Sequence, residues 1–510
     1  MSDTAVAESG TRLQNFLDRA GLRGFPWKTA TILYTISWGW LFIVRNSYWV
    51  DDWTLFGNPK VAAEDGRSLG YPPWMEINQF LLKVAGVSSF RFLTFIIFFG
   101  VTVSIFSITG KLLFITLHQR RVQAIFFLVL PFYTARVTLM TAHYTEALGL
   151  FFVAWFLLVN YKSPKSRLAS YLLFFLSFQM FTLLVFFLLP VIHLFILENG
   201  RNFQKCLIFL KSKAIFISLP VIYWVLRALY WPGSREYHVI TSRKIDGFVK
   251  FLFLCLVIVC LSVLIYWKSR GGRKKSALLF QCGLIALFLG YAPYVFFGLV
   301  GNGFDVPITY FIILVGRSDW YSRHQILQSL GFSLALVGLI GFLPRMSAKF
   351  ASTLVASVMV ISIIFNALFG FEYVVDYQKQ IQIVAELKNS GQSSEKSEIQ
   401  IIDQTVFLNA RQRSYRERDW LGLIGLADGV NPTKALRVLG DCSMNPNTRL
   451  VLIRGPETHW EALKNWVSDG DMGFRVTVDD TPGACKPEMV KNQQSSGAIP
   501  ILFYFTGAKG

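Results

Sequence analysis

The sequence predicts a polytopic α-helical membrane protein with about eleven transmembrane segments and a small α/β domain at its C-terminal end. Three observations predict this fold class. Of the 510 residues, 53% are hydrophobic and 16% are charged, whereas an ordinary soluble protein has about 25% charged residues. The apolar residues form runs long enough to cross a bilayer, and basic residues gather in the short loops between those runs. After about residue 372 the composition becomes that of a soluble domain.

The net charge of +19 does not indicate a nucleic-acid partner, because the basic residues follow the positive-inside pattern of membrane proteins. Residues 1–26 are polar and contain no secretory signal peptide, so we expect a cytoplasmic N-terminal segment. The chain would then lie in the inner membrane of a bacterium, with its N-terminus inside and its C-terminal domain outside. The densest basic group consists of Lys268, Arg270, Arg273, Lys274 and Lys275.

The apolar runs place the transmembrane domain at residues 27–371. A first span over about 27–44 makes the loop 45–89 the first outer loop. The run 168–197 lies between two basic loops, so one helix across it would put a basic loop on the wrong side of the membrane. We therefore predict two short helices that reverse near Gln179–Thr182, inside the bundle. The other spans are expected at 90–109, 122–141, 146–161, 214–231, 248–267, 276–299, 325–343 and 349–370.

Residues 372–510 are predicted to form the extracytoplasmic α/β domain. Apolar residues between Val374 and Leu387 recur at helical spacing, and a second helix is expected around Trp460 and Trp466. Cys442 and Cys485 both belong to this domain, where an oxidising compartment would let them form a disulfide. Short β-like runs occur at Ile399–Ile402, Leu450–Ile453, Phe474–Val478 and Ile499–Phe505.

Two adjacent carboxylates, Asp51 and Asp52, follow the first span and lie between Trp49 and Trp53. Acidic groups at the edge of the hydrocarbon are costly. They are either a solvated flank in the headgroup region or a general base, because a partly desolvated carboxylate beside a second one can accept a proton from an alcohol near neutral pH. The pair also offers hard oxygen ligands for a divalent metal, although nothing in the sequence requires one.

An apolar stripe follows in the same outer loop. Pro72 and Pro73 fix an extended turn, after which Ile77, Phe80, Leu81 and Val84 recur at helical spacing. A helix lying on the outer membrane surface explains the stripe. Packing into a protein core would produce the same pattern.

A second polar group surrounds the outer turn between the third and fourth spans, where Arg136, His143 and Glu146 occur. Glu146 either contributes to a binding site or interacts with the N-terminal dipole of the fourth span. His143 is either a ligand contact or a neutral residue of the membrane interface.

A third group, Arg317, Arg323 and His324, comes directly before a later span, on the outer side. The planar guanidinium suits a phosphate held at headgroup depth. The alternative is that these side chains only anchor the span by extending to the interface.

In their order and their shared side of the membrane, these features resemble the GT-C integral-membrane glycosyltransferases, which include the protein O-mannosyltransferases and the lipid A aminoarabinose transferase. The resemblance covers about residues 25–345. It implies a GT-C-like bundle that transfers a sugar, with inversion, from a polyprenyl-phosphate carrier to an envelope glycan, lipid or protein outside the membrane.

The resemblance also implies roles for single residues. Asp51 matches the catalytic acidic residue of the family, and Asp52 matches its acidic neighbour. Tyr71 begins a Tyr-Pro-Pro segment that resembles the family's Pro-Pro segment, but some members have Lys in its place, so one cationic contact is missing here. Glu146 stands where many members have Asp. Arg323 resembles the arginine that faces the carrier phosphate.

Two other classes of function compete with a transferase. Charged residues within the spans or an internal repeat would favour a transporter or flippase for a lipid-linked precursor. Here the apolar runs are nearly free of acidic residues, and the charges gather at one face. A non-catalytic membrane anchor for the outer domain is the third possibility, and it leaves that gathering of charge unexplained.

Overall fold

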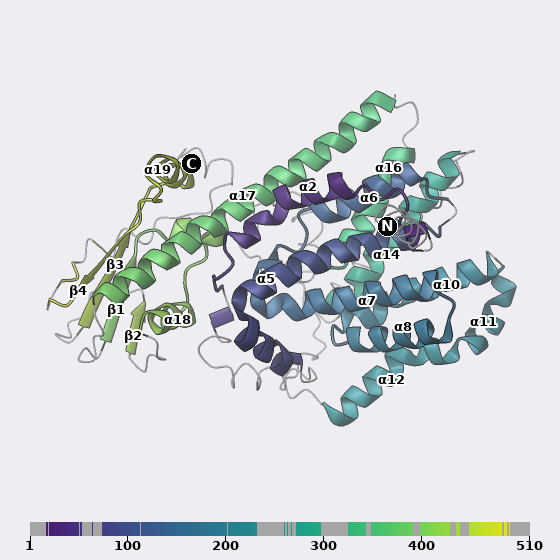
Figure 1. Cartoon of the computed structure of the whole chain (residues 1–510), viewed down its shortest axis with the longest axis horizontal. Helices are drawn as coiled ribbons and strands as arrows, with labels where there is room; N and C mark the ends of the chain where they lie inside the picture. Colours follow the sequence, from purple (N-terminus) through teal and green to yellow (C-terminus); the bar gives the residue numbers. More distant parts are fainter. Residues whose placement is uncertain are drawn as a thin grey trace, which may run out of the picture.

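The protein is mostly helical and carries a small sheet domain at one end (Figure 1). The structure is a computed structural model. It describes residues 17–18, 20–49, 52–53, 64, 74–112, 114–200, 202–231, 260, 263, 267, 272–296, 325–342, 348–390, 398–428, 435–438, 448–481, 484–486 and 489.

The helical region is built from helices of very different lengths. In its first part these are α2 (Trp27–Trp38), the 3-10 turn η1 (Gly39–Phe42), α5 (Trp74–Thr109), α6 (Leu117–Val129), η2 (Thr134–Val137), η3 (Leu139–Thr141) and α7 (Ala142–Asn160). They are followed by α8 (Pro164–Ser177), α9 (Thr182–Phe186), α10 (Leu188–Asn199), η4 (Phe203–Lys205), α11 (Cys206–Ser212), α12 (Ala214–Tyr230), α14 (Gly272–Phe296), α16 (Gln328–Phe342) and α17 (Ala348–Asn389).

Four stretches among the described residues are long and apolar enough to cross a membrane: Glu76–Thr109, Leu139–Asn160, Thr182–Asn199 and Lys349–Asn389. A fifth is added if α11 and α12, which meet at a bend of 62°, count as one span. The count of about eleven is not confirmed. The predicted span 248–267 lies almost entirely outside the described residues.

Two predicted spans are shorter than expected. The helix predicted at 122–141 ends at Val129, because Leu130 is extended (φ −60°, ψ 135°) before Pro131, a residue that disfavours helix at the preceding position. The chain then continues in the 3-10 turns η2 and η3. Similarly, α2 ends at Trp38 and only η1 continues the predicted first span.

The predicted reversal within residues 168–197 is confirmed. Helix α8 ends at Ser177 and α9 begins at Thr182. On α7, the Ala154 carbonyl accepts a hydrogen bond from the Ser170 hydroxyl (2.8 Å), while the Trp155 indole donates to Nδ1 of His193 (3.1 Å). Ser170 and His193 therefore lie at the same level of the bundle, although a continuous helix would separate them by about 35 Å.

Helix α5 is two helices joined at a kink. Gly86 has φ 71° and ψ 174° inside it, a left-handed conformation that glycine adopts without strain. Before the kink, Ile77, Phe80 and Val84 are exposed. The apolar stripe therefore faces outward, and the core-packing alternative is wrong for these three residues.

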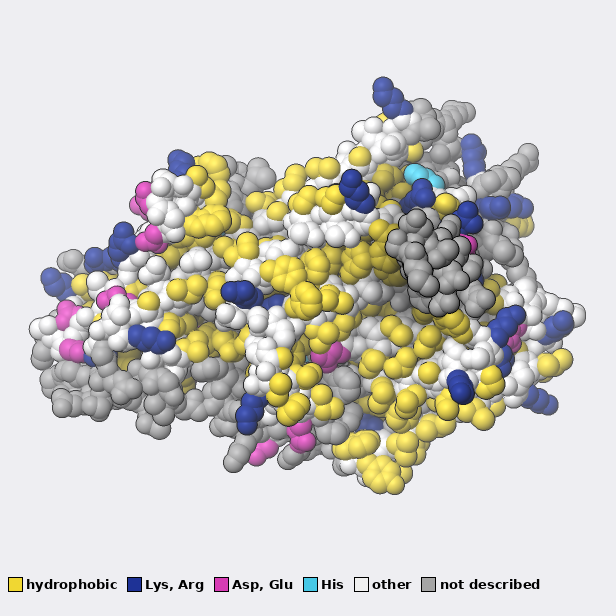
Figure 2. Space-filling view, viewed as in Figure 1, with side chains coloured by type: hydrophobic (Ala, Val, Ile, Leu, Met, Phe, Trp, Pro, Cys, Tyr) yellow, Lys and Arg dark blue, Asp and Glu magenta, His cyan; other side chains and the backbone are white. Residues whose placement is uncertain are grey.

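The basic loops meet at one end of the bundle. Arg120 in the first turn of α6 donates to the Gly21 carbonyl (2.9 Å), and Asn160 at the end of α7 donates to the Ser107 hydroxyl (2.9 Å). Figure 2 shows Lys and Arg gathered at the end that carries α10 and α11, whereas hydrophobic side chains cover most of the middle of the helical region. This distribution is typical of a protein with a lipid-facing belt.

Helix α17 connects the bundle to the sheet domain without interruption. Its outward side chains from Phe350 to Ala367 are uncharged and mostly apolar, and the helix then continues to Asn389. The predicted boundary at residue 372 therefore lies inside a continuous helix, and the helix expected over 374–387 is its second half.

The sheet has the order β2-β1-β3-β4, in which β1 is parallel to β2 and β3, and β4 is antiparallel to β3. Three strands match predicted runs, one was not predicted, and the predicted run 499–505 lies outside the described residues. The domain contains β1 (Glu398–Asp403), η6 (Val406–Leu408), η7 (Ala410–Gln412), α18 (Glu417–Asp428), β2 (Ala435–Val438), β3 (Thr448–Arg454), α19 (His459–Asp469) and β4 (Arg475–Asp479).

One half of the predicted disulfide is described. Cys485 is disulfide-bonded, whereas Cys206, Cys260 and Cys282 are not part of a disulfide. The expected partner, Cys442, lies outside the described residues.

Candidate functional site

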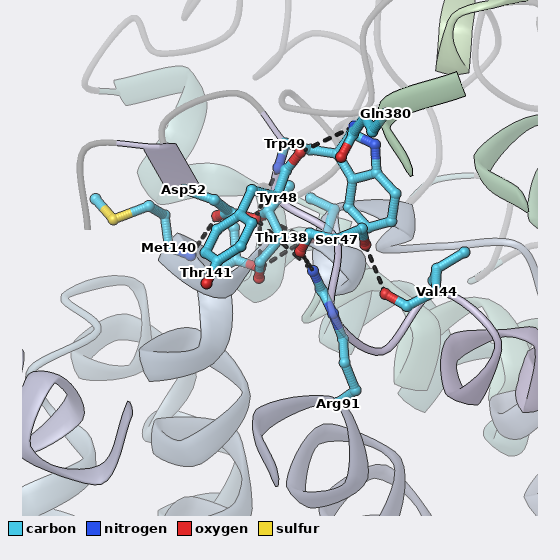
Figure 3. A network of polar contacts seen from close by, with 11 residues as sticks. Val44, Ser47, Tyr48, Trp49, Asp52, Arg91, Thr138, Met140, Thr141 and Gln380 are labelled. Carbon is cyan, nitrogen blue, oxygen red and sulfur yellow. Dashed lines mark hydrogen bonds and ion pairs between the residues drawn. The ribbon is translucent and has the colours of Figure 1, made fainter. Parts of the chain in front are cut away.

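Asp52 is the centre of a buried polar network at the end of the bundle that carries the sheet domain (Figure 3). It lies in the acidic loop, residues 47–53, of which 47–49 and 52–53 are described. One carboxylate oxygen accepts the backbone N–H of Trp49 at 3.1 Å, and the other accepts the backbone N–H of Met140 at 3.0 Å. The loop is thereby tied to the turn between α6 and α7.

Arg91 supplies the charge opposite Asp52. It lies five residues after the kink in α5, is 1% exposed, and places Nη2 3.8 Å from the Asp52 carboxylate. The same nitrogen donates to the Ser47 carbonyl at 3.1 Å, and the guanidinium lies 5.1 Å from the centre of the Trp49 ring. Arg91 thus fixes both ends of the turn that contains Asp52.

Burial raises the pKa of Asp52 from 3.8 to about 6. Removal from water disfavours the charged carboxylate, and Arg91 and the backbone N–H groups only partly offset this effect. A carboxyl group with such a pKa changes protonation close to neutral pH.

Arg136 is held by the protein in the neighbouring turn, and its predicted role in substrate binding stays a prediction. Its Nε and Nη2 donate to the carbonyls of Tyr133 (3.0 Å) and Phe132 (2.9 Å). Its guanidinium lies between the rings of Trp38 (3.8 Å) and Phe98 (3.9 Å). Both faces and two nitrogens are occupied by the protein, so the side chain stabilises the chain reversal after Pro131.

His143 and Glu146 follow Met140, whose backbone N–H binds Asp52, within six residues along the chain. Helix α7 begins at Ala142, two residues after the Met140 amide that binds Asp52. Glu146 therefore lies in the second turn and not at the helix N-terminus, so the dipole explanation for it is wrong. Both side chains are buried, and the His143 ring lies 4.1 Å from the Tyr144 ring.

The remaining predicted site residues lie outside the described part of the chain. These are Asp51, Tyr71, Arg317, Arg323 and His324. Their predicted roles stay predictions. Within the described residues, no group of three or more His, Cys, Asp and Glu side chains could hold a metal ion.

Three residues of this region were not singled out from the sequence. Arg91 interrupts an apolar run, and a lone arginine in such a run was a usable signal. Gln380 of α17 donates to the Tyr48 carbonyl at 3.2 Å, and Gly422 of α18 lies against the Trp53 ring. No local pattern marks these two, because each acts on a loop that is distant in the sequence.

Comparison of the chain with protein-family models, curated proteins and solved structures finds no match. Function is therefore inferred from the residues and the geometry of this chain.

Proposed function

We propose that the chain is an inverting glycosyltransferase that moves a sugar from a polyprenyl-phosphate carrier to an acceptor on the outer face of the cytoplasmic membrane. The acceptor is an envelope glycan, a glycolipid or a protein. The proposal includes the finer topology: about eleven spans in a GT-C-like bundle, a cytoplasmic N-terminus and a periplasmic C-terminal domain.

The anchoring of Asp52 carries the proposal. Its carboxylate is fully buried and binds Trp49, Met140 and Arg91. A carboxylate that is held this firmly has a defined position relative to the start of α7. Reactions that transfer a group depend on such fixed positions, because orientation removes much of the entropic barrier.

The two aspartates then have different roles. Asp52 is engaged on both oxygens, so it is a positioning residue. Asp51 precedes it directly in the chain and is the proposed general base, in agreement with the residue that the GT-C resemblance assigns as catalytic. A divalent metal on the pair is compatible with carboxylate oxygens, and no step of the proposal requires it.

The proposed step is a single displacement. Asp51 takes the proton of an acceptor hydroxyl, whose oxygen bonds to the anomeric carbon of the donor sugar with inversion. The bond between that carbon and the phosphate oxygen breaks, and the polyprenyl phosphate leaves with the electron pair. Arg323, assisted by Arg317 or His324, is proposed to stabilise the phosphate charge through guanidinium and imidazole N–H groups.

A comparison of wild-type and deletion strains by mass spectrometry of envelope glycans and glycolipids tests the class of function. A sugar that is missing in the deletion strain and restored by the wild-type gene supports a transferase. An intact precursor that accumulates on the inner side of the membrane would instead identify a transporter or flippase.

The base is tested by complementation with Asp51→Asn. We expect the sugar to be absent at wild-type protein levels, because the variant has no carboxylate to accept the proton. Glu64→Gln is the matched control, since Glu64 is an exposed acid of the predicted first outer loop, residues 45–89. Full glycosylation by Asp51→Asn would refute the mechanism.

A further inference from the structure

The acidic loop contacts the helical bundle on one side and the C-terminal domain on the other. A Cβ atom on Gly422 of α18 would overlap the six-membered ring of Trp53. The Trp53 ring therefore lies directly on the backbone of α18, a contact that only glycine permits. Trp53 is 3% exposed and belongs to one hydrophobic cluster with Trp420 and Leu423 of the same helix.

Helix α17 contacts the loop at a second point. Gln380 is buried, and its Nε2 donates to the Tyr48 carbonyl at 3.2 Å (Figure 3). About two helical turns earlier, the Tyr373 ring meets the Trp49 ring edge-on, with 4.8 Å between the ring centres. Both contacts lie beyond Ala367, where the uncharged outward surface of the first half of α17 ends.

Buried polar contacts lock the sheet domain to the same part of α17. Lys379 binds Asp403 of β1 at 2.5 Å and Asn409 at 2.6 Å, and its side chain is fully buried. The Asp376 carboxylate accepts hydrogen bonds from the Tyr415 hydroxyl and from the backbone N–H of Ala410. Buried charges are expensive unless they are fully paired, so these contacts define one relative position of the domain and the helix.

We propose that the C-terminal domain is a positioning element for the acidic loop, with Gly422 and Gln380 as the residues through which it acts. The domain is locked to α17, and together α17 and α18 contact three described residues of the loop: Tyr48, Trp49 and Trp53. The consequence for catalysis rests on the proposed function: loss of these contacts misplaces the acidic pair and lowers kcat.

The test uses the full chain in lipid nanodiscs and hydrogen exchange of the peptide that covers residues 47–53. Gly422→Ala introduces a methyl group where the Trp53 ring lies. We expect exchange in this peptide to rise by at least about tenfold, because the displaced ring releases the turn. Gln380→Ala, which removes one hydrogen bond and adds no bulk, is expected to raise it in the same peptide by a smaller factor.

Gly455→Ala is the matched control. A Cβ atom there would lie 2.8 Å from Cδ1 of Phe474, within the sheet domain and away from the acidic loop. We expect this variant to raise exchange around residues 472–478 and to leave residues 47–53 unchanged. The proposal is overturned if Gly422→Ala leaves exchange at 47–53 at the wild-type level, or if Gly455→Ala raises it equally.

Transfer kinetics separate this inference from the proposed function. If the chain is a transferase, Gly422→Ala should lower kcat while KM for the polyprenyl-phosphate sugar stays near the wild-type value, since the proposed phosphate contacts are not altered. A uniform loss of folded protein would also lower the apparent kcat without changing KM, so kcat is calculated per mole of folded protein. If wild-type protein transfers no sugar, the proposed function fails, whereas the exchange result still decides the positioning role.

Discussion

Replacing Asp52 with asparagine should destabilise the protein by about 3–5 kcal/mol, the usual effect of leaving one member of a buried ion pair without its partner. Arg91 is 1% exposed and, among the described residues, would retain the Ser47 carbonyl alone as a hydrogen-bond partner. The introduced side-chain amide would also present an N–H group to the Trp49 N–H or to the Met140 N–H, each of which now has a carboxylate oxygen.

A second substitution tests the cause. Adding Arg91→Met removes the uncompensated buried charge and keeps a side chain of similar length. We therefore expect the double variant to recover at least about 2 kcal/mol relative to Asp52→Asn alone, a coupling within the range of contacting buried pairs. The free energy of unfolding is measured by titration with sodium dodecyl sulfate in mixed micelles.

An exposed ion pair provides the control. Asp471 and Arg475 lie 3.2 Å apart, closer than Asp52 and Arg91, but their side chains are 40% and 73% exposed. Asp471→Asn should change the unfolding free energy by less than about 1 kcal/mol, because water screens the pair. The reasoning is refuted if Asp52→Asn is no more harmful than Asp471→Asn, or if Arg91→Met does not recover stability.

One further prediction concerns the contact between α17 and the sheet domain. Lys379→Met should lower the free energy of unfolding of the sheet domain by about 3–5 kcal/mol, because Asp403 loses its buried partner. Faster proteolysis of the sheet domain would be the readout, and Lys388→Met, an exposed lysine of the same helix, should leave the rate unchanged.

Sequence patterns identified those features that depend on a short segment and on whether its side chains face lipid or water. The reversal within residues 168–197 followed from the charges of two flanking loops, and the helix before Gly86 followed from four apolar residues at helical spacing. Three of the four strands of the sheet appeared as short apolar runs. Each is a local effect, because the bilayer and the helical repeat constrain a segment without reference to the rest of the chain.

One prediction from the apolar pattern was wrong for a local reason. Residues 130–141 continue a strongly apolar run and were assigned to the same span, yet Pro131 ends the helix and the segment forms turns around Arg136. In these turns Nε and Nη2 of Arg136 donate to the carbonyls of Tyr133 and Phe132.

The sequence by itself determined that this protein has long apolar helices, basic loops at one end and an acidic pair after the first helix. Only the tertiary structure decided what Asp52 does. Its partner Met140 is 88 residues away, and Gln380, which binds the same loop, is 332 residues from Tyr48. Such contacts depend on packing between helices that are distant in the chain, and neither hydropathy nor spacing carries that information.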